Sequence, residues 1–132
     1  MAAVLDTHAA IWYVFSRKRL SRDALRFIRH AVDSGRPAYV SAISLVETIY
    51  LIERGRIPFE AIQRLEAGLK DPSSGLYVAP VDEEVAQAVH RVRRDLVPEM
   101  PDRIIAATAL CLDLPLVTRD ARIASAGIRT IW

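Results

Sequence analysis

Residues 2–9 read Ala-Ala-Val-Leu-Asp-Thr-His-Ala, a short apolar run that stops at an aspartate. Apolar residues without polar alternation are typical of a strand that helices cover on both faces, as in a parallel sheet. We therefore predict a buried strand over Ala2–Leu5, with Asp6 at its carboxyl end. Ligands of such sheets bind at that end of the strands, which makes Asp6 the first candidate functional residue.

Similar apolar runs recur along the chain and predict four more strands, over Ala38–Val40, Leu76–Ala79, Pro115–Val117 and Ile128–Ile131. Segments with helical spacing of their apolar residues lie between the strands. The predicted helices are Ala9–Ser16, Asp23–Asp33, Ser41–Glu53, Pro58–Leu69, Glu83–Asp95, Pro101 to at least Cys111, and Ala121–Ala126. This alternation predicts the α/β class, as a three-layer α/β/α domain around a mainly parallel sheet of about five short strands.

The length and composition fit one domain over residues 1–132, since 52% of the 132 residues are apolar. The longest apolar stretches, Ala9–Phe15 and Ile104–Leu112, are shorter than the roughly 20 residues that a membrane span needs. The N-terminal stretch is also too short and lacks the basic residues of a signal peptide, so we expect a cytoplasmic protein. The one cysteine, Cys111, excludes an internal disulfide and is expected to be a small buried apolar residue.

Basic residues are spread unevenly, although the net charge is only +2. The segment Arg17–Arg36, called the basic segment below, holds seven basic residues and two acidic ones. Such a segment is typical of a surface that follows a nucleic-acid backbone, and equally of a solvated helix face. The sequence leaves both interpretations open.

Four acids lie shortly after predicted strands or near the start of a predicted helix, where functional residues of such sheets are expected: Asp6, Glu47, Asp102 and Asp120. The predicted fold would gather them at one edge of the sheet. Two like charges about 4 Å apart repel by about 4 kcal/mol at an effective dielectric near 20, so such a group needs raised pKa values or a bound cation. Oxygen ligands without His or Cys suit Mg²⁺ or Mn²⁺, as one ion or two. The expected chemistry is hydrolysis of a phosphodiester by water that the cation activates.

Each acid also has a structural alternative. Asp6 fits the cap of a turn and Asp120 the N-cap of a helix, and Asp102 fits the first turn of a helix, where it complements the dipole. Ser44 and Glu47 match the S-x-x-E capping box, in which Glu47 would only stabilise a helix start.

Neighbouring polar and aromatic residues carry weaker signals. Thr7 and Thr118 flank two of the acids and suit contacts to a carboxylate, a water or a phosphate, as well as ordinary capping. The three histidines are dispersed without the spacing of a metal site, so we expect surface or core roles for them. Trp12 and Trp132 are interpreted as packing residues.

The acids lie in four segments that follow one another in a recognisable order: Leu5–Ala9 (LDTHA), Val40–Glu47 (VSAISLVE), Asp102–Ala109 (DRIIAATA) and Leu114–Asp120 (LPLVTRD). Together they resemble the PIN-domain proteins, in particular the VapC-type toxins of bacterial toxin–antitoxin pairs. The resemblance extends from Leu5 to Trp132. Each segment alone is a weak signal, whereas the ordered set in a chain of this length is specific.

The resemblance implies a PIN-like fold, an acidic metal site made by the four acids with Thr118 as polar neighbour, and Mg²⁺ or Mn²⁺ as cofactor. It also implies endonucleolytic cleavage of RNA, a homodimer, and a cognate VapB-type antitoxin whose tail covers the site. The chain departs from the pattern at Glu99 and Met100, where related proteins often carry an aspartate–proline pair; here Pro101 adjoins Asp102 instead. Glu99 is therefore interpreted as either an outer ligand or a solvated loop acid.

Other function classes fit less well. A phosphatase of the haloacid-dehalogenase type needs a second aspartate where His8 stands, and a receiver domain needs a lysine near its last strand, yet Lys18 and Lys70 are the only lysines. The remaining alternative is a non-catalytic PIN-like module that binds RNA or a partner. The presence of all four acids argues against it.

Overall fold

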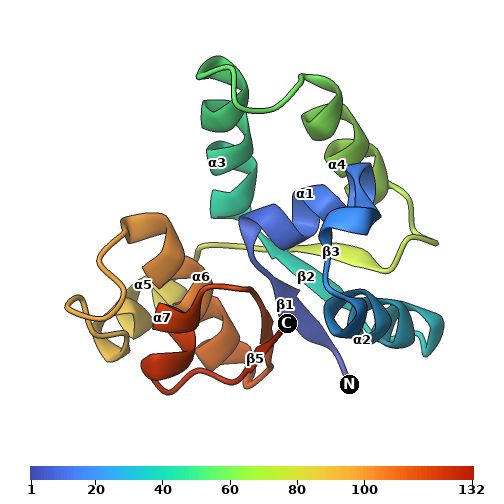
Figure 1. Ribbon diagram of the computed structural model, residues 1–132. Helices are drawn as coiled ribbons and strands as arrows, with labels where there is room; N and C mark the ends of the chain where they lie inside the picture. The colour runs from blue at the N-terminus through green and yellow to red at the C-terminus, as the bar shows by residue number, and fades with distance from the viewer.

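Five short parallel strands form the centre of the computed structural model, which describes residues 1–132 (Figure 1). They lie in the order β3-β2-β1-β4-β5. Their bounds are β1 (Ala3–Leu5), β2 (Ala38–Ser41), β3 (Leu76–Ala79), β4 (Leu116–Val117) and β5 (Thr130–Ile131). The predicted parallel sheet is confirmed. Strand β4 starts one residue later than predicted, at the point where Pro115 has no N–H to add to the sheet; β5 is also shorter than predicted.

Seven α-helices connect the strands and cover the sheet. They are α1 (Thr7–Phe15), α2 (Arg22–Asp33), α3 (Ala42–Glu53), α4 (Glu60–Lys70), α5 (Glu83–Ala88), α6 (Met100–Leu112) and α7 (Ala121–Ser125), with short 3₁₀ turns at Arg17–Arg19 (η1) and Val89–Arg91 (η2). Helix α1 begins two residues earlier than predicted, because the Asp6 side chain caps it by accepting from the amide of Ala9. None of the helices is long and apolar enough to cross a membrane.

The predicted helix over Glu83–Asp95 is wrong beyond Ala88. A 3₁₀ turn follows α5, and Val92 is extended. The Arg103 side chain donates hydrogen bonds to the carbonyl oxygens of Val89 and Val92, at 3.0 and 2.8 Å. Those carbonyls are satisfied from α6 instead of from a continuing helix, and β-branched valines favour a helix only weakly.

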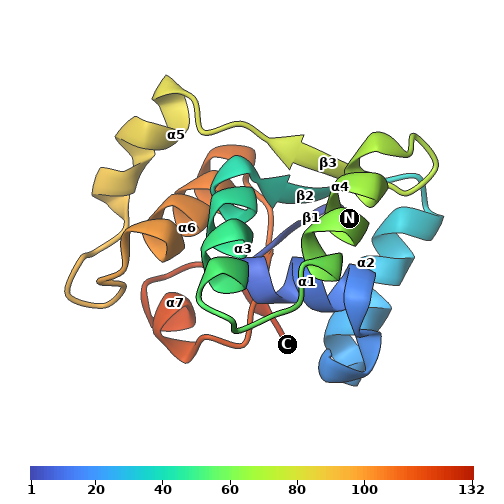
Figure 2. The same ribbon diagram turned by 90° about the horizontal axis from the view of Figure 1, so that it is seen from above.

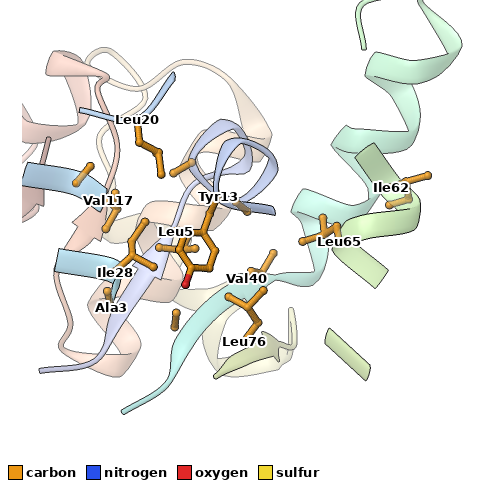
Figure 3. Close-up of a cluster of buried hydrophobic side chains, with 14 residues drawn as sticks. Ala3, Leu5, Tyr13, Leu20, Ile28, Val40, Ile62, Leu65, Leu76 and Val117 are labelled. Carbon is orange, nitrogen blue, oxygen red and sulfur yellow. The ribbon is translucent and has the colours of Figure 1, made fainter. Parts of the chain in front are cut away.

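The core consists of two apolar clusters on opposite faces of the sheet. Ala3 and Leu5 belong to the cluster that α1, α2 and α4 cover, part of which Figure 3 shows, whereas Val4 belongs to the cluster under α5, α6 and α7. This alternation is what a strand buried on both faces requires. Figures 1 and 2 show the helices on the two sides of the sheet, so the three-layer α/β/α prediction is confirmed. Cys111 is only partly buried, at the rim of the second cluster.

The order of the strands places the candidate residues. The chain runs from β1 outward through β2 and β3, then returns to add β4 and β5 on the other side of β1. The boundary between β1 and β4 is therefore the switch point at which ligands of such sheets bind. Asp6 leaves β1 at this point, and its amide donates to the Val117 carbonyl of β4 at 3.1 Å.

Candidate active site

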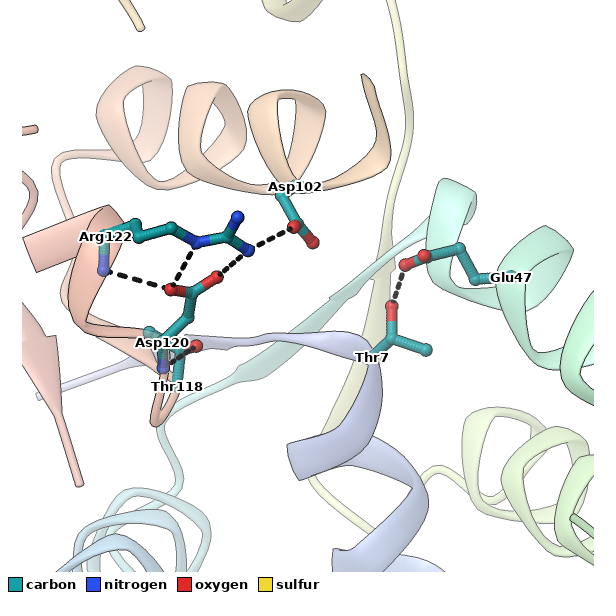
Figure 4. Close-up of polar contacts among 6 residues, drawn as sticks. All are labelled: Thr7, Glu47, Asp102, Thr118, Asp120 and Arg122. Carbon is teal, nitrogen blue, oxygen red and sulfur yellow. Dashed lines mark hydrogen bonds and ion pairs between the residues drawn. The ribbon is translucent and has the colours of Figure 1, made fainter. Parts of the chain in front are cut away.

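The four predicted acids line one pocket of about 550 Å³ at the carboxyl ends of the strands. Asp6 lies between β1 and α1, Glu47 in α3, Asp102 in the first turn of α6, and Asp120 at the N-cap of α7. Figure 4 shows three of these side chains, with the threonines and the arginine that contact them. The fold thus gathers at one place acids that lie far apart in the sequence, from Asp6 to Asp120.

Asp6 is both a helix cap and a wall of the pocket. Its Oδ1 accepts a hydrogen bond from the Ala9 amide at 2.8 Å, so Asp6 does act as a cap, of helix α1 instead of the predicted turn. Burial raises the pKa of Asp6, and the repulsion from Glu47 adds to the rise. The Thr118 hydroxyl, the Ala9 amide and the His8 side chain act in the opposite direction. Asp6 therefore caps α1 and lines the pocket with the same carboxylate.

Glu47 is not part of a capping box. Helix α3 starts at Ala42 with Ser41 as its N-cap, whose Oγ accepts from the Ile43 amide at 3.2 Å. Glu47 lies within the helix, and its carboxylate accepts a hydrogen bond from the Thr7 hydroxyl of α1 (Figure 4). The Ser44 hydroxyl lies 2.9 Å from the Thr7 oxygen, so a pair of hydroxyls fixes the orientation of Glu47. Thr7 therefore supports the site.

The pKa of Asp102 is raised by its burial and by the three other acids of the pocket. Burial raises the pKa of Asp102 to about 6, and the negative charges of Glu47, Asp120 and Asp6 contribute in that order. The Arg122 guanidinium lowers it only in part. The sequence analysis expected raised pKa values where the acids gather, and the raised pKa of Asp102 agrees with that expectation.

Arg122 is a partner of the acids that the sequence analysis missed. Its Nε and Nη2 lie 3.1 and 2.9 Å from the two carboxylate oxygens of Asp120, and its Nη2 lies 3.9 Å from Oδ2 of Asp102 (Figure 4). The hydrogen bond from Arg122 lowers the pKa of Asp120. Arg122 thus partly neutralises one side of the acidic group.

The side chains as they stand include no cluster of three His, Cys, Asp or Glu residues close enough to hold a metal ion. The contacts account for this spacing, since the carboxylate of Glu47 is held by Thr7 and that of Asp120 by Arg122. The four acids offer oxygen donors only, and their mutual repulsion would be relieved by a cation. The donor set therefore fits Mg²⁺ or Mn²⁺.

The pocket has a second set of lining residues that the sequence analysis assigned elsewhere: His8, Trp12, Arg119 and Trp132. We call them the aromatic wall. Trp12 and Trp132 pack against the first core cluster and His8 is exposed, as predicted. That all three also line the pocket was not predicted. A signal was present, because His8 and Trp12 are one helical turn apart directly after Asp6, and Arg119 precedes Asp120.

Two further predicted residues lie at different distances from the pocket. Thr118 is buried beneath it, and its Oγ1 accepts from the Asp120 amide at 3.1 Å. Glu99 is exposed and does not line the pocket of the four acids. It lines a neighbouring groove between α3 and the start of α6, to which Glu47 and Asp102 also contribute.

All seven basic residues of the basic segment are exposed. Arg22, Arg26 and Arg29 lie on one face of α2 around a shallow hollow of about 410 Å³. None of these three pairs with an acidic side chain. That arrangement suits phosphate contact, and the role of the segment stays a prediction.

Comparison with known families decides the classification. The sequence model of the PIN domain matches residues 3–128. This chain belongs to the PIN-domain family. The resemblance seen in the four sequence segments is therefore confirmed, and the match covers all four acids of the pocket.

Relatives of this PIN-domain protein include Ribonuclease VapC22 of Mycobacterium tuberculosis, which is 32% identical over 92% of this chain and 89% of that protein. Among solved structures, DNA-bound VapBC from Salmonella typhimurium has a chain 26% identical, with a TM-score of 0.66 and coverage of 98% and 96% of the two chains. A chain of VapBC2 from Rickettsia felis, bound to a promoter DNA fragment, is similar in fold alone, with 15% identity, a TM-score of 0.73 and coverage of 98% and 97%.

Proposed function

We propose that this PIN-domain protein is a Mg²⁺- or Mn²⁺-dependent endoribonuclease that serves as the toxin of a type II toxin–antitoxin pair. The main support for the proposal is the acidic pocket, in which the negative charges of the three other acids help to raise the pKa of Asp102. The ribonuclease name of the relative from M. tuberculosis supports the reaction. The VapBC complexes support a VapB-type antitoxin as partner, and a homodimer is proposed with it.

Asp6, Glu47, Asp102 and Asp120 would hold one cation or two. A bound Mg²⁺ or Mn²⁺ would supply Lewis-acid chemistry, activating water and stabilising charge on the phosphate oxygens during in-line hydrolysis. The chain itself would orient the ligands. Ala9 fixes Asp6 at the start of α1, and Thr7 fixes Glu47.

The cations of the pocket have different proposed roles. Arg122 pairs with Asp120 and lies 3.9 Å from Asp102, so it would limit the repulsion between these acids before a divalent ion arrives. Arg119 is exposed, lines the pocket, and has no acidic partner. It is therefore the side chain best able to attract an RNA phosphate toward an otherwise acidic pocket.

Cleavage of total cellular RNA by the purified chain tests the proposal. Discrete fragments are expected with Mg²⁺ or Mn²⁺ and none with chelator, and the Asp6→Asn/Asp102→Asn variant should make none. Glu66→Gln is the matched control, because Glu66 is exposed on α4 outside the pocket. RNA bound but not cut by folded protein that is free of antitoxin would favour the non-catalytic binding module instead.

A further inference from the structure

The aromatic wall is a continuous series of ring contacts. The His8 and Trp12 rings have centroids 5.4 Å apart, and those of Trp12 and Trp132 are 5.9 Å apart. The Arg119 guanidinium lies 5.4 Å from the centroid of the Trp12 ring. The residues come from α1, from the loop after β4 and from the residue after β5, so the fold rather than local sequence brings them together.

These rings keep part of their surface open. Trp12 and Trp132 are only partly buried, and His8 and Arg119 are exposed. A large aromatic side chain stabilises a fold most when it is fully buried, and this wall gives up part of that contribution. The open surface belongs to the same pocket as the four acids. Packing alone accounts for the buried parts of the tryptophans but not for the exposed rings beside the acids.

We propose that the aromatic wall stacks an unpaired nucleobase adjacent to the phosphodiester group that the acids act on. This assignment rests on the proposed ribonuclease function and names the residues that would contact the base beside the cleaved bond. Aromatic rings and guanidinium planes stack on the faces of unpaired bases. A base inside a duplex has both faces covered by its neighbours and cannot enter such a contact without leaving the stack.

Charge favours the same orientation of the substrate. The acids would repel a phosphate that entered without a cation, whereas Arg119 supplies a positive charge at the edge of the wall. A nucleotide would therefore place its base against Trp12 and its phosphate toward Arg119 and the acids. The stacking is indifferent to base identity, because every base has a π-face.

Tryptophan fluorescence reports on this wall directly, since the chain has two tryptophans and both are in it. The folded Asp6→Asn/Asp102→Asn variant is titrated with an unstructured RNA octamer, with the same octamer in a duplex, and with an octamer of abasic residues. The single strand is expected to quench the fluorescence and to bind about tenfold more tightly than the other two. Equal affinity for the single-stranded and abasic octamers would overturn the proposal, and this arm needs no change in the wall.

Substitutions in the wall separate stacking from packing. Trp12→Leu is expected to weaken binding of the single strand about tenfold, whereas Trp12→Phe should retain affinity within about threefold, because phenylalanine still stacks. Phe59→Leu is the control, since Phe59 is 63% exposed and lies outside the pocket. Equal affinity of the Leu and Phe variants, both with native thermal unfolding, would also overturn the proposal.

The outcomes also separate this proposal from the proposed function. Quenching by single-stranded RNA without any metal-dependent cleavage would retain the stacking wall and reject the nuclease. Metal-dependent cleavage with no quenching, and with an unchanged KM in Trp12→Leu, would retain the nuclease and reject the wall.

Discussion

Replacing Asp102 by asparagine is expected to stabilise the metal-free protein while abolishing its activity. Burial and three neighbouring carboxylates raise the pKa of Asp102 from 3.8 to about 6. At 1.36 kcal/mol for each pKa unit, ionising this carboxyl in the folded protein opposes folding by up to about 3 kcal/mol. The side chain is 29% exposed and loses a distant contact to Arg122, so solvent screening reduces the expected gain to about 1 kcal/mol.

Thermal unfolding in chelator at pH 8 measures this gain. A stabilisation of about 1 kcal/mol should raise Tm by about 3–5 °C in a chain of this size. The Glu66→Gln control changes the net charge by the same amount at an exposed position of α4. It should leave Tm unchanged within about 1 °C.

The pH dependence gives the prediction a second test. Because the pKa of Asp102 is higher in the folded state than in the unfolded state, the destabilisation is fully present above about pH 6 and declines as the pH falls toward 4. The Tm difference between Asp102→Asn and the unsubstituted protein should therefore shrink over that range. A variant that is less stable at pH 8, or a difference that grows on acidification, would refute the view that burial and the neighbouring carboxylates disfavour the ionised form of Asp102.

Three further predictions address other contacts. Arg122→Ala should lower Tm in chelator yet strengthen Mg²⁺ binding, measured by calorimetry, because the acids lose their internal cation; weaker Mg²⁺ binding would contradict this role. Thr7→Val should destabilise the chain by about 1 kcal/mol in denaturant unfolding and lower kcat more than KM changes, whereas unaltered kcat would show that Glu47 needs no orientation. Reversing Arg22, Arg26 and Arg29 to glutamate should weaken RNA binding and flatten its salt dependence; an unchanged slope in a salt titration would exclude RNA docking by the basic segment.

The acids were predictable because their positions follow from the sheet. An unbroken apolar strand that ends at an aspartate indicates both a buried parallel strand and the edge at which ligands bind, and this reasoning located Asp6 and Asp120. Short-range patterns were less reliable. The S-x-x-E match around Glu47 is a coincidence inside a helix that Ser41 caps.

The long-range contacts of the aromatic wall could not be predicted in the same way, because they depend on which chain segments the fold places side by side. The contact of Arg122 with Asp120, by contrast, joins residues only two positions apart. Trp132 follows the edge strand and meets Trp12 only when β5 and α1 are in place. The early end of α5 has the same origin, since Arg103 of α6 donates hydrogen bonds to the carbonyls of Val89 and Val92, which follow α5. Periodicity describes one segment at a time and contains no record of such pairs.

Asp6 and Asp120 each begin a helix with the same carboxylate that they present to the pocket. A substitution at either position can therefore change both the activity and the stability of the protein. Alanine would remove the charge and the cap together, at a loss of about 1 kcal/mol of stability, whereas asparagine caps a helix about as well as aspartate. An asparagine variant is therefore the appropriate inactive variant for trapping an RNA or an antitoxin. An alanine variant would change the chemistry and the stability at the same time.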